Sequence, residues 1–161
     1  MTAAPISTNV RARVDSLEPD PPVAGSNDGA IVLGAGAIVV VGAFADRDDL
    51  ILEDRLNHAS LLDAGLLART RAFERYAHCD ADAAAAALRA QHEARPNASA
   101  MLVTDGVFSM DGDTAPLAEL AELCTAHAAW LMVDDAHGFG VLGDRGVGST
   151  EAAGLSPAAV P

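Results

Sequence analysis

The chain has 161 residues, of which half are hydrophobic and 4% aromatic, and its formal net charge is −13. This length and hydrophobicity are sufficient for one domain with a substantial core. All the positive charge comes from ten scattered arginines, and the sequence contains no lysine. The acidic balance argues against a nucleic-acid surface and against binding to an acidic membrane.

The start of the chain has the character of an irregular tail. It is polar, three of residues 19–22 are prolines, and no basic cluster precedes an apolar run as it does in a secretory signal. We expect an irregular or disordered segment over residues 1–28, a folded domain over residues 29–161 and a cytoplasmic protein. Cys79 and Cys124 are predicted to be reduced thiols, because two cysteines make no disulfide framework and neither has metal-ligand spacing.

An uncharged stretch follows at residues 29–45. It is short for a membrane span, which needs about 20 apolar residues, so a buried strand followed by a helix over residues 37–45 explains it better. The glycines of Leu33-Gly34-Ala35-Gly36 could approach a phosphate, but a turn beside a hydrophobic strand is the favoured interpretation.

Downstream, apolar runs alternate with amphipathic stripes. Runs that are typical of buried strands occupy residues 50–52, 100–104 and 130–133, and residues 73–76 are a candidate for a further short strand. The stripes predict helices over residues 60–68, 83–93 and 116–127, and a glycine-rich loop over residues 138–148. Asp80 or Asp82 can cap the second helix, and Pro116 fits the first turn of the third. The alternation predicts an α/β fold with a mostly parallel sheet flanked by helices.

Ligands of such sheets bind beyond the carboxyl ends of the strands. Asp134 and His137 follow the last predicted strand. A carboxylate there is partly desolvated and needs a proton-donating partner such as a pyridinium nitrogen, while the histidine can reach a neighbouring ring substituent. For these residues alone, a helix cap by Asp134 or Asp135 with an incidental histidine is an equally good explanation. A metal site is a third interpretation, but further ligands are not evident.

Residues 105–113 follow another predicted strand, and Ser109 offers a hydroxyl to a phenolic or phosphate oxygen. Asp111 and Asp113 have the spacing that begins a calcium loop, but the glycine and glutamate that such a loop requires are absent. By itself this stretch therefore predicts only a turn.

Residues 54–60 follow the strand at residue 50. His58 has a flat imidazole that could lie on an aromatic cofactor ring. Alternatively, Asn57 or Ser60 caps the next helix and His58 has no role of its own.

Together the three segments resemble the α-oxoamine synthases, which are pyridoxal-phosphate enzymes of the aspartate-aminotransferase fold. The resemblance rests on Asp-Arg-Leu-Asn-His-Ala-Ser-Leu at 54–61, Gly-Val-Phe-Ser-Met-Asp-Gly-Asp at 106–113 and Val-Asp-Asp-Ala-His-Gly at 133–138, and it extends over residues 46–149. It implies that residues 29–161 are an incomplete large domain of the type I pyridoxal-phosphate fold.

The resemblance also implies roles for single residues. His58 would stack on the ring of pyridoxal 5'-phosphate, Ser109 and His137 would hydrogen-bond the ring oxygen, and Asp134 would pair with the pyridine nitrogen. Asp105 stands where the family commonly has glutamate and is a further candidate. The implied reaction joins an acyl thioester to an amino acid with loss of carbon dioxide, and the implied assembly is a homodimer.

Within the family, the resemblance is nearest to the biotin-biosynthesis branch, which uses a pimeloyl thioester and L-alanine. The Schiff-base lysine of the family has no counterpart, because the sequence has no lysine. We therefore expect a truncated or frame-disrupted member with little or no synthase activity. Two alternatives stay open: a glycine-using relative, and a non-catalytic remnant or binding module that pairs with a full-length homologue.

Overall fold

In the computed structural model, which describes residues 37–155, a four-stranded sheet lies at the centre of the molecule. Its strands are β1 (Leu50–Asp54), β2 (Ala72–Tyr76), β3 (Ala100–Asp105) and β4 (Trp130–Asp134). They are ordered β2-β1-β3-β4, and every neighbouring pair is parallel. The predicted α/β fold with a parallel sheet is thereby confirmed.

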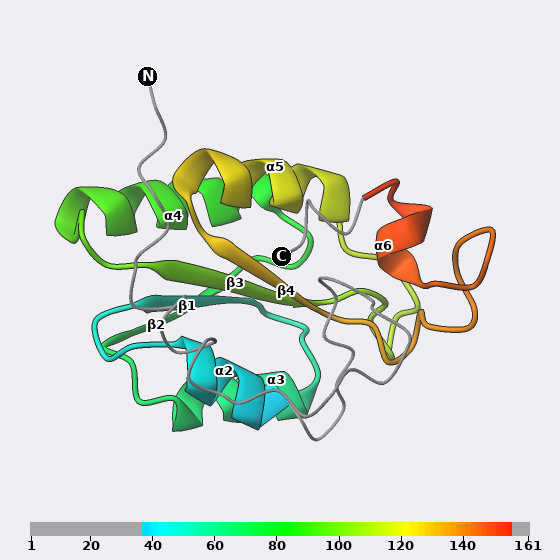
Figure 1. Cartoon of the computed structure of the whole chain (residues 1–161), viewed down its shortest axis with the longest axis horizontal. Coiled ribbons are helices and arrows are strands. Elements are labelled where there is room, and N and C mark those ends of the chain that lie inside the picture. Colours follow the sequence, from blue (N-terminus) through cyan, green and yellow to red (C-terminus); the bar gives the residue numbers. More distant parts are fainter. Residues whose placement is uncertain (1–36, 156–161) are drawn as a thin grey trace, which may run out of the picture.

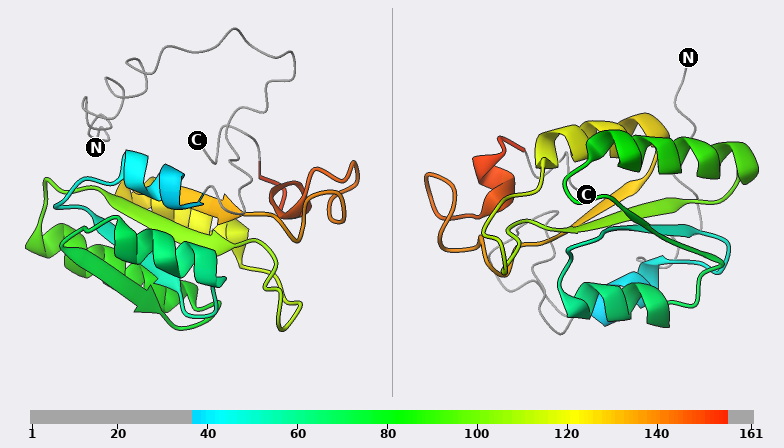
Figure 2. Two further views of the ribbon diagram at one scale, coloured as in Figure 1. Left: turned by 90° about the horizontal axis from the view of Figure 1, so that it is seen from below. Right: turned by 180° about the vertical axis from the view of Figure 1, so that it is seen from behind.

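Helices cover both faces of the sheet (Figure 1). One face carries α4 (Ala81–Ala94) and α5 (Leu117–His127), and the other carries α2 (Ala37–Phe44) and α3 (Ala59–Leu67); both views of Figure 2 show the same layers. The sequence explains this cover, because β1 and β3 are buried along their whole length and so need packing on both faces.

The core is divided by the sheet into two clusters. Leu50 and Leu52 belong to the cluster that includes residues of α4 and α5, whereas Ile51 lies in the cluster that includes residues of α2 and α3. Leu102 and Val103 divide in the same way in β3. Successive side chains of a strand point to opposite faces, so alternate residues of one apolar run fill both clusters.

The ends of the predicted elements shift by a few residues. The strand predicted at 50–52 continues through Glu53 and Asp54, because both acidic side chains are buried with the rest of β1. Asp80 caps α4 as predicted: its carboxylate accepts a hydrogen bond from the amide of Ala83 at 2.8 Å. The short α6 (Ser149–Ala152) was not predicted.

The start of α3 corrects a prediction. Neither Asn57 nor Ser60 caps this helix; His58 is the N-cap residue, and its Nδ1 accepts a hydrogen bond from the amide of Ser60 at 3.2 Å. Asn57 does not cap the helix because its side-chain amide is hydrogen-bonded to the backbone of β3.

The helix predicted over residues 37–45 is present as α2, and only part of it is buried. Val41 is fully buried, whereas Val39 is 71% exposed. Among residues 37–155, no helix is both long and apolar enough to cross a membrane. The tail predicted over residues 1–28 and the glycine turn at 33–36 lie outside the described residues.

Candidate functional site at the carboxyl ends of the strands

Four aspartates gather at one edge of the sheet and are almost completely buried. Asp54, Asp105 and Asp134 end β1, β3 and β4, and Asp135 follows directly. Their exposed fractions lie between 1% and 4%. The parallel register aligns Asp105 with Asp134, so the sheet itself sets two of these carboxylates side by side. This is the edge at which parallel sheets bind ligands.

Asp134 is a buried acid on which the charges of two exposed histidines act. Its Oδ1 accepts a hydrogen bond from the amide of Ala136 at 3.0 Å. Burial raises the pKa of Asp134, while the Ala136 amide and the charges of His58 and His137 act in the opposite direction. Both histidines are exposed. The arrangement therefore offers a partly desolvated carboxylate to a cationic or proton-donating group.

Asp105 holds the segment that carries His58. Its Oδ2 accepts a hydrogen bond from the backbone amide of His58 at 2.6 Å. Burial raises the pKa of Asp105 to about 6, although the His58 amide lowers it. This contact spans 47 residues of sequence and fixes the backbone from which the His58 ring projects.

Asn57 binds the same segment to β3. Its Nδ2 donates to the carbonyl of Val103 at 2.9 Å, and its Oδ1 accepts from the amide of Asp105 at 3.0 Å. The side chain is 5% exposed. The side-chain amide thus takes the place of a neighbouring strand where β1 has ended, which satisfies two backbone groups that would otherwise be buried without partners.

The structure brings four of the five predicted site residues together: the charges of His58 and His137 act on both Asp105 and Asp134. Ser109 lies on the neighbouring loop between β3 and α5 and is exposed. Within the described part of the chain, no hydrogen bond joins its hydroxyl to the other four.

Asp135 forms a second centre, which the sequence presented only as a helix-cap alternative. Its Oδ2 accepts a hydrogen bond from the amide of Ser149 at 2.8 Å, at the start of α6. Three glycines surround the carboxylate: a Cβ added to Gly106, Gly138 or Gly148 would lie 2.7, 2.2 or 1.8 Å from one of its oxygens. Only glycine fits at these positions, so the carboxylate fixes the glycine-rich loop between β4 and α6.

Sequence reasoning missed a third group, which contains His78, Cys79 and Asp113. His78 and Cys79 follow β2, the one strand whose carboxyl end was not considered. Applying the strand-end rule to β2 would have found them. Both cysteines are free thiols, as predicted.

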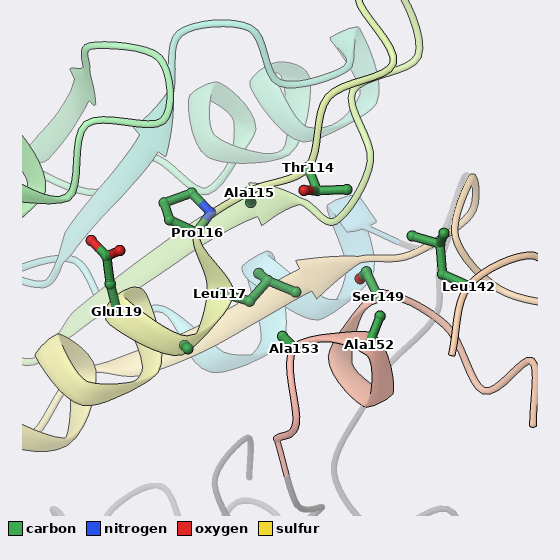
Figure 3. Close-up of a pocket in the computed structure, with 10 residues that line it drawn as sticks. Thr114, Ala115, Pro116, Leu117, Glu119, Leu142, Ser149, Ala152 and Ala153 are labelled. Carbon is green, nitrogen blue, oxygen red and sulfur yellow. The ribbon is translucent and has the colours of Figure 1, made fainter. Parts of the chain in front are cut away.

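A cavity of about 270 Å³ lies between the start of α5 and α6. Figure 3 shows Thr114, Ala115 and Pro116 on one side and Ser149, Ala152 and Ala153 on the other. None of the five predicted site residues lines it, and Glu119 is its one ionisable lining residue. The convergence of ionisable groups therefore places the candidate site at the buried aspartates and not in this cavity.

Comparison with known proteins agrees with this geometry. The family model of the class I and II aminotransferases matches residues 23–159. The 8-amino-7-oxononanoate synthase of Thioalkalivibrio sulfidiphilus is 52% identical over 135 residues, covering 82% of this chain and 33% of the relative. That of Methylococcus capsulatus is 58% identical over 122 residues, covering 76% of this chain and 30% of the relative. The chain thus spans about a third of the length of these curated relatives.

Solved structures give the same result for the fold. Serine palmitoyltransferase of Sphingomonas wittichii superimposes with a TM-score of 0.70 at 32% identity, covering 78% of this chain and 30% of that one. The 8-amino-7-oxononanoate synthase of Francisella tularensis does so with a TM-score of 0.57 at 27% identity, covering 76% and 33%. These enzymes depend on pyridoxal phosphate and share the type I fold. The chain therefore belongs to the class I and II aminotransferase family, and within it to the α-oxoamine synthases.

Proposed function

We propose that this chain is a large-domain segment of an enzyme with the activity of 8-amino-7-oxononanoate synthase, which condenses a pimeloyl thioester with L-alanine and releases carbon dioxide. The observation that carries the proposal is the agreement between relatives of that name, 48–58% identical, and a buried aspartate at the strand ends on which the charges of two histidines act. Composition still favours a cytoplasmic protein.

The donor set fits the ring of pyridoxal phosphate. Asp134 is a buried carboxylate that would hold the proton of a pyridine nitrogen, since burial makes a cationic partner favourable. The exposed ring of His58 would lie against the face of the cofactor, and Ser109 and His137 would donate to its ring oxygen. When bound, the cofactor supplies an electron sink for charge that develops beside the amino-acid nitrogen.

In this proposal Asp105 does not contact the cofactor directly. Because it accepts the amide hydrogen of His58, it orients the stacking ring from below. We assign it to positioning, together with Asn57.

These 161 residues contain no lysine, so this stretch of chain holds the cofactor without the covalent attachment that a lysine would provide. By itself it should have little or no synthase activity. A glycine-using relative is the less favoured alternative, because the relatives that are 52% and 58% identical carry the name 8-amino-7-oxononanoate synthase.

Pairing with a second chain, as in a homodimer or with a full-length homologue, is part of the proposal. Met110, Phe139 and Val141 are 90%, 54% and 74% exposed, and all three lie on loops beyond the carboxyl ends of the strands. Exposed apolar side chains beside a candidate site favour coverage by further protein.

Titration with pyridoxal phosphate, followed by the absorbance of the cofactor, tests the proposal. The chain should bind reversibly, and Asp134→Ala should weaken binding about 10- to 100-fold, the effect of losing a charge-assisted hydrogen bond. Asp48→Ala, at the opposite edge of the sheet, is the matched control and should bind as the unchanged chain does. Equal affinity of all three proteins would contradict the cofactor site.

A synthase assay tests the expected lack of synthase activity. The purified chain, supplied with cofactor, a pimeloyl thioester and L-alanine, should form no 8-amino-7-oxononanoate. Formation of that product by the lysine-free chain would contradict the expected lack of activity.

A further inference from the structure

The imidazole of His78 is bonded on both sides. Its Nδ1 lies 2.9 Å from Oδ1 of Asp54, and its Nε2 lies 2.7 Å from Oδ2 of Asp113. Two carboxylates on opposite edges of one ring require both nitrogens to donate, which is the hydrogen-bonding pattern of an imidazolium. Burial lowers the pKa of His78, but the hydrogen bonds to the two aspartates outweigh it and leave the pKa raised.

Asp54 is a fixed anchor for this ring. It is 1% exposed at the end of β1, where its Oδ1 also accepts from the amide of Leu56 and its Oδ2 from the amide of Cys79, each at 2.8 Å. Three donors from two segments therefore hold one buried carboxylate, and the imidazole has a set direction.

On its other side His78 contacts the loop between β3 and α5. This loop is a small closed turn, in which Val107 bridges to Thr114 and the amides of Phe108 and Gly112 donate to the carbonyls of Asp113 and Phe108 at 3.0 and 2.8 Å. The ring of Phe108 meets the imidazole edge to face, with centroids 4.4 Å apart and planes at 87°. His78 thus contacts the turn twice, through Phe108 and through Asp113.

Ser109 lies between these two contacts in sequence. Its own side chain is exposed, so the position of its hydroxyl depends on the backbone of the turn. Asp113 is 46% exposed at its side chain, and among residues 37–155 His78 is the hydrogen-bond partner of its carboxylate.

Cys79 makes a second, weaker link between Asp54 and the turn: its amide donates to Oδ2 of Asp54, and its thiol lies 3.7 Å from the carbonyl of Thr114. His78 makes the link between charged groups.

A metal ion is the competing explanation, since ligand atoms of Asp54, His78 and Cys79 lie within 4.8 Å of one another. Both imidazole nitrogens, however, are already directed at carboxylates. Burial, with the charges of Asp54 and Asp113, raises the pKa of the Cys79 thiol to about 11, which disfavours the thiolate.

We propose that His78 is a positioning residue of the cofactor site: it braces the turn of residues 107–114 against Asp54 and thereby places the Ser109 hydroxyl. The inference rests on the proposed function for what Ser109 binds, but the brace itself is a property of the chain without cofactor.

Two amide variants test the two hydrogen bonds of the imidazole one at a time. The amide of His78→Asn reaches about as far as Nδ1 and keeps the contact with Asp54, whereas that of His78→Gln reaches about as far as Nε2 and keeps the contact with Asp113. Hydrogen exchange of the whole chain, measured without cofactor, should show the amides of Phe108 and Gly112 exchanging about tenfold faster in His78→Asn, the effect of losing one charge-assisted hydrogen bond. His78→Gln should restore part of the protection, because the turn stays attached through Asp113 to a backbone segment that the amide of Cys79 holds to Asp54.

His92→Asn is the matched control, because His92 is exposed at the end of α4 and should leave exchange unchanged. Should His78→Asn not fold, Asp113→Ala removes the same contact from the exposed side. Cofactor titration then links the brace to the site: His78→Asn should bind pyridoxal phosphate several-fold more weakly, and Ser109→Ala should do so without changing exchange.

Unchanged exchange in both His78→Asn and Asp113→Ala, or faster exchange spread over the whole sheet, would overturn the brace. Stoichiometric zinc binding that His78→Asn abolishes would also overturn it in favour of a metal site. If the unchanged chain binds no pyridoxal phosphate, the proposed function fails, while the exchange result still decides the brace.

Discussion

The two edges of the sheet use the same residue type in opposite ways. At the amino edge, Asp48 pairs with Arg71 at 2.8 Å while their side chains are 63% and 57% exposed. At the carboxyl edge, Asp134 and Asp135 are buried and accept hydrogen bonds from backbone amides. Asp48 therefore remains solvated and contributes little, whereas Asp134 and Asp135 are held in place by the fold. Asp49, next to Asp48, is intermediate: it is half-buried and accepts from the amides of Asp46 and Ser99. The candidate site is therefore distinguished by the burial of its aspartates more than by their charge.

The largest expected effect concerns Gly148, which has φ 121° and whose added Cβ would lie 1.8 Å from Oδ2 of Asp135. Gly148→Ala should lower the free energy of unfolding by about 3 kcal/mol, through backbone strain and displacement of the buried carboxylate. Gly112→Ala is the control: φ is 77°, but nothing lies within 4 Å of the added Cβ, so about 1 kcal/mol is expected. Equal losses in urea unfolding would show that Asp135 does not organise this edge.

Asn57→Ala should cost about 2 kcal/mol, because the carbonyl of Val103 and the amide of Asp105 would be left buried without their partner. Asn97, which is exposed near the amino edge, provides the matched control, and its replacement by alanine should change stability by less than about 0.5 kcal/mol. Urea unfolding of Asn57→Ala and Asn97→Ala compares the stability lost at the two edges. Indistinguishable unfolding midpoints would show that Asn57 contributes no more than Asn97.

Glu53 makes the stability of the folded chain depend on pH. It is fully buried in β1, neither carboxyl oxygen has a hydrogen-bond partner within the described residues, and burial raises its pKa to about 8. From about pH 4.5 to pH 8 the unfolded chain releases this proton while the folded chain keeps it, so the contribution of Glu53 to stability falls as pH rises.

Glu53→Gln removes this titration and should raise the free energy of unfolding at pH 8 by about 1–2 kcal/mol, with a smaller difference at pH 5. Unfolding measured across that range checks the slope. A parallel pH profile in the two proteins would mean that Glu53 is ionised in the folded chain.

The smallest effect is expected at the amino edge. Asp48→Asn breaks the ion pair with Arg71 and should change stability by less than about 0.5 kcal/mol, because both side chains are more than half exposed. A loss above 1 kcal/mol in the same urea titration would show that the amino edge is held together by its charges, and the contrast between the two edges would weaken.

Local patterns were sufficient to predict the elements of the sheet and most of the candidate site. The apolar run at 100–104 and the leucine stripe at 117, 120 and 123 predicted β3 and α5, because strands and helices repeat with fixed periods. Asp134 and His137 were found from their place after a strand. Asp113 was noted only as an incomplete calcium loop, since its partner His78 lies 35 residues earlier.

By itself the sequence determined that this is a parallel α/β protein with the motifs of the α-oxoamine synthases and no lysine. The tertiary structure decided which side chains act together. It assigned the cap of α3 to His58, directed Asp105 at the His58 backbone, and set His78 between two aspartates. Periodicity is a local property that a single segment carries. The contacts of Asp105 and His78, by contrast, join segments that follow different strands and exist only when the register of the sheet is formed.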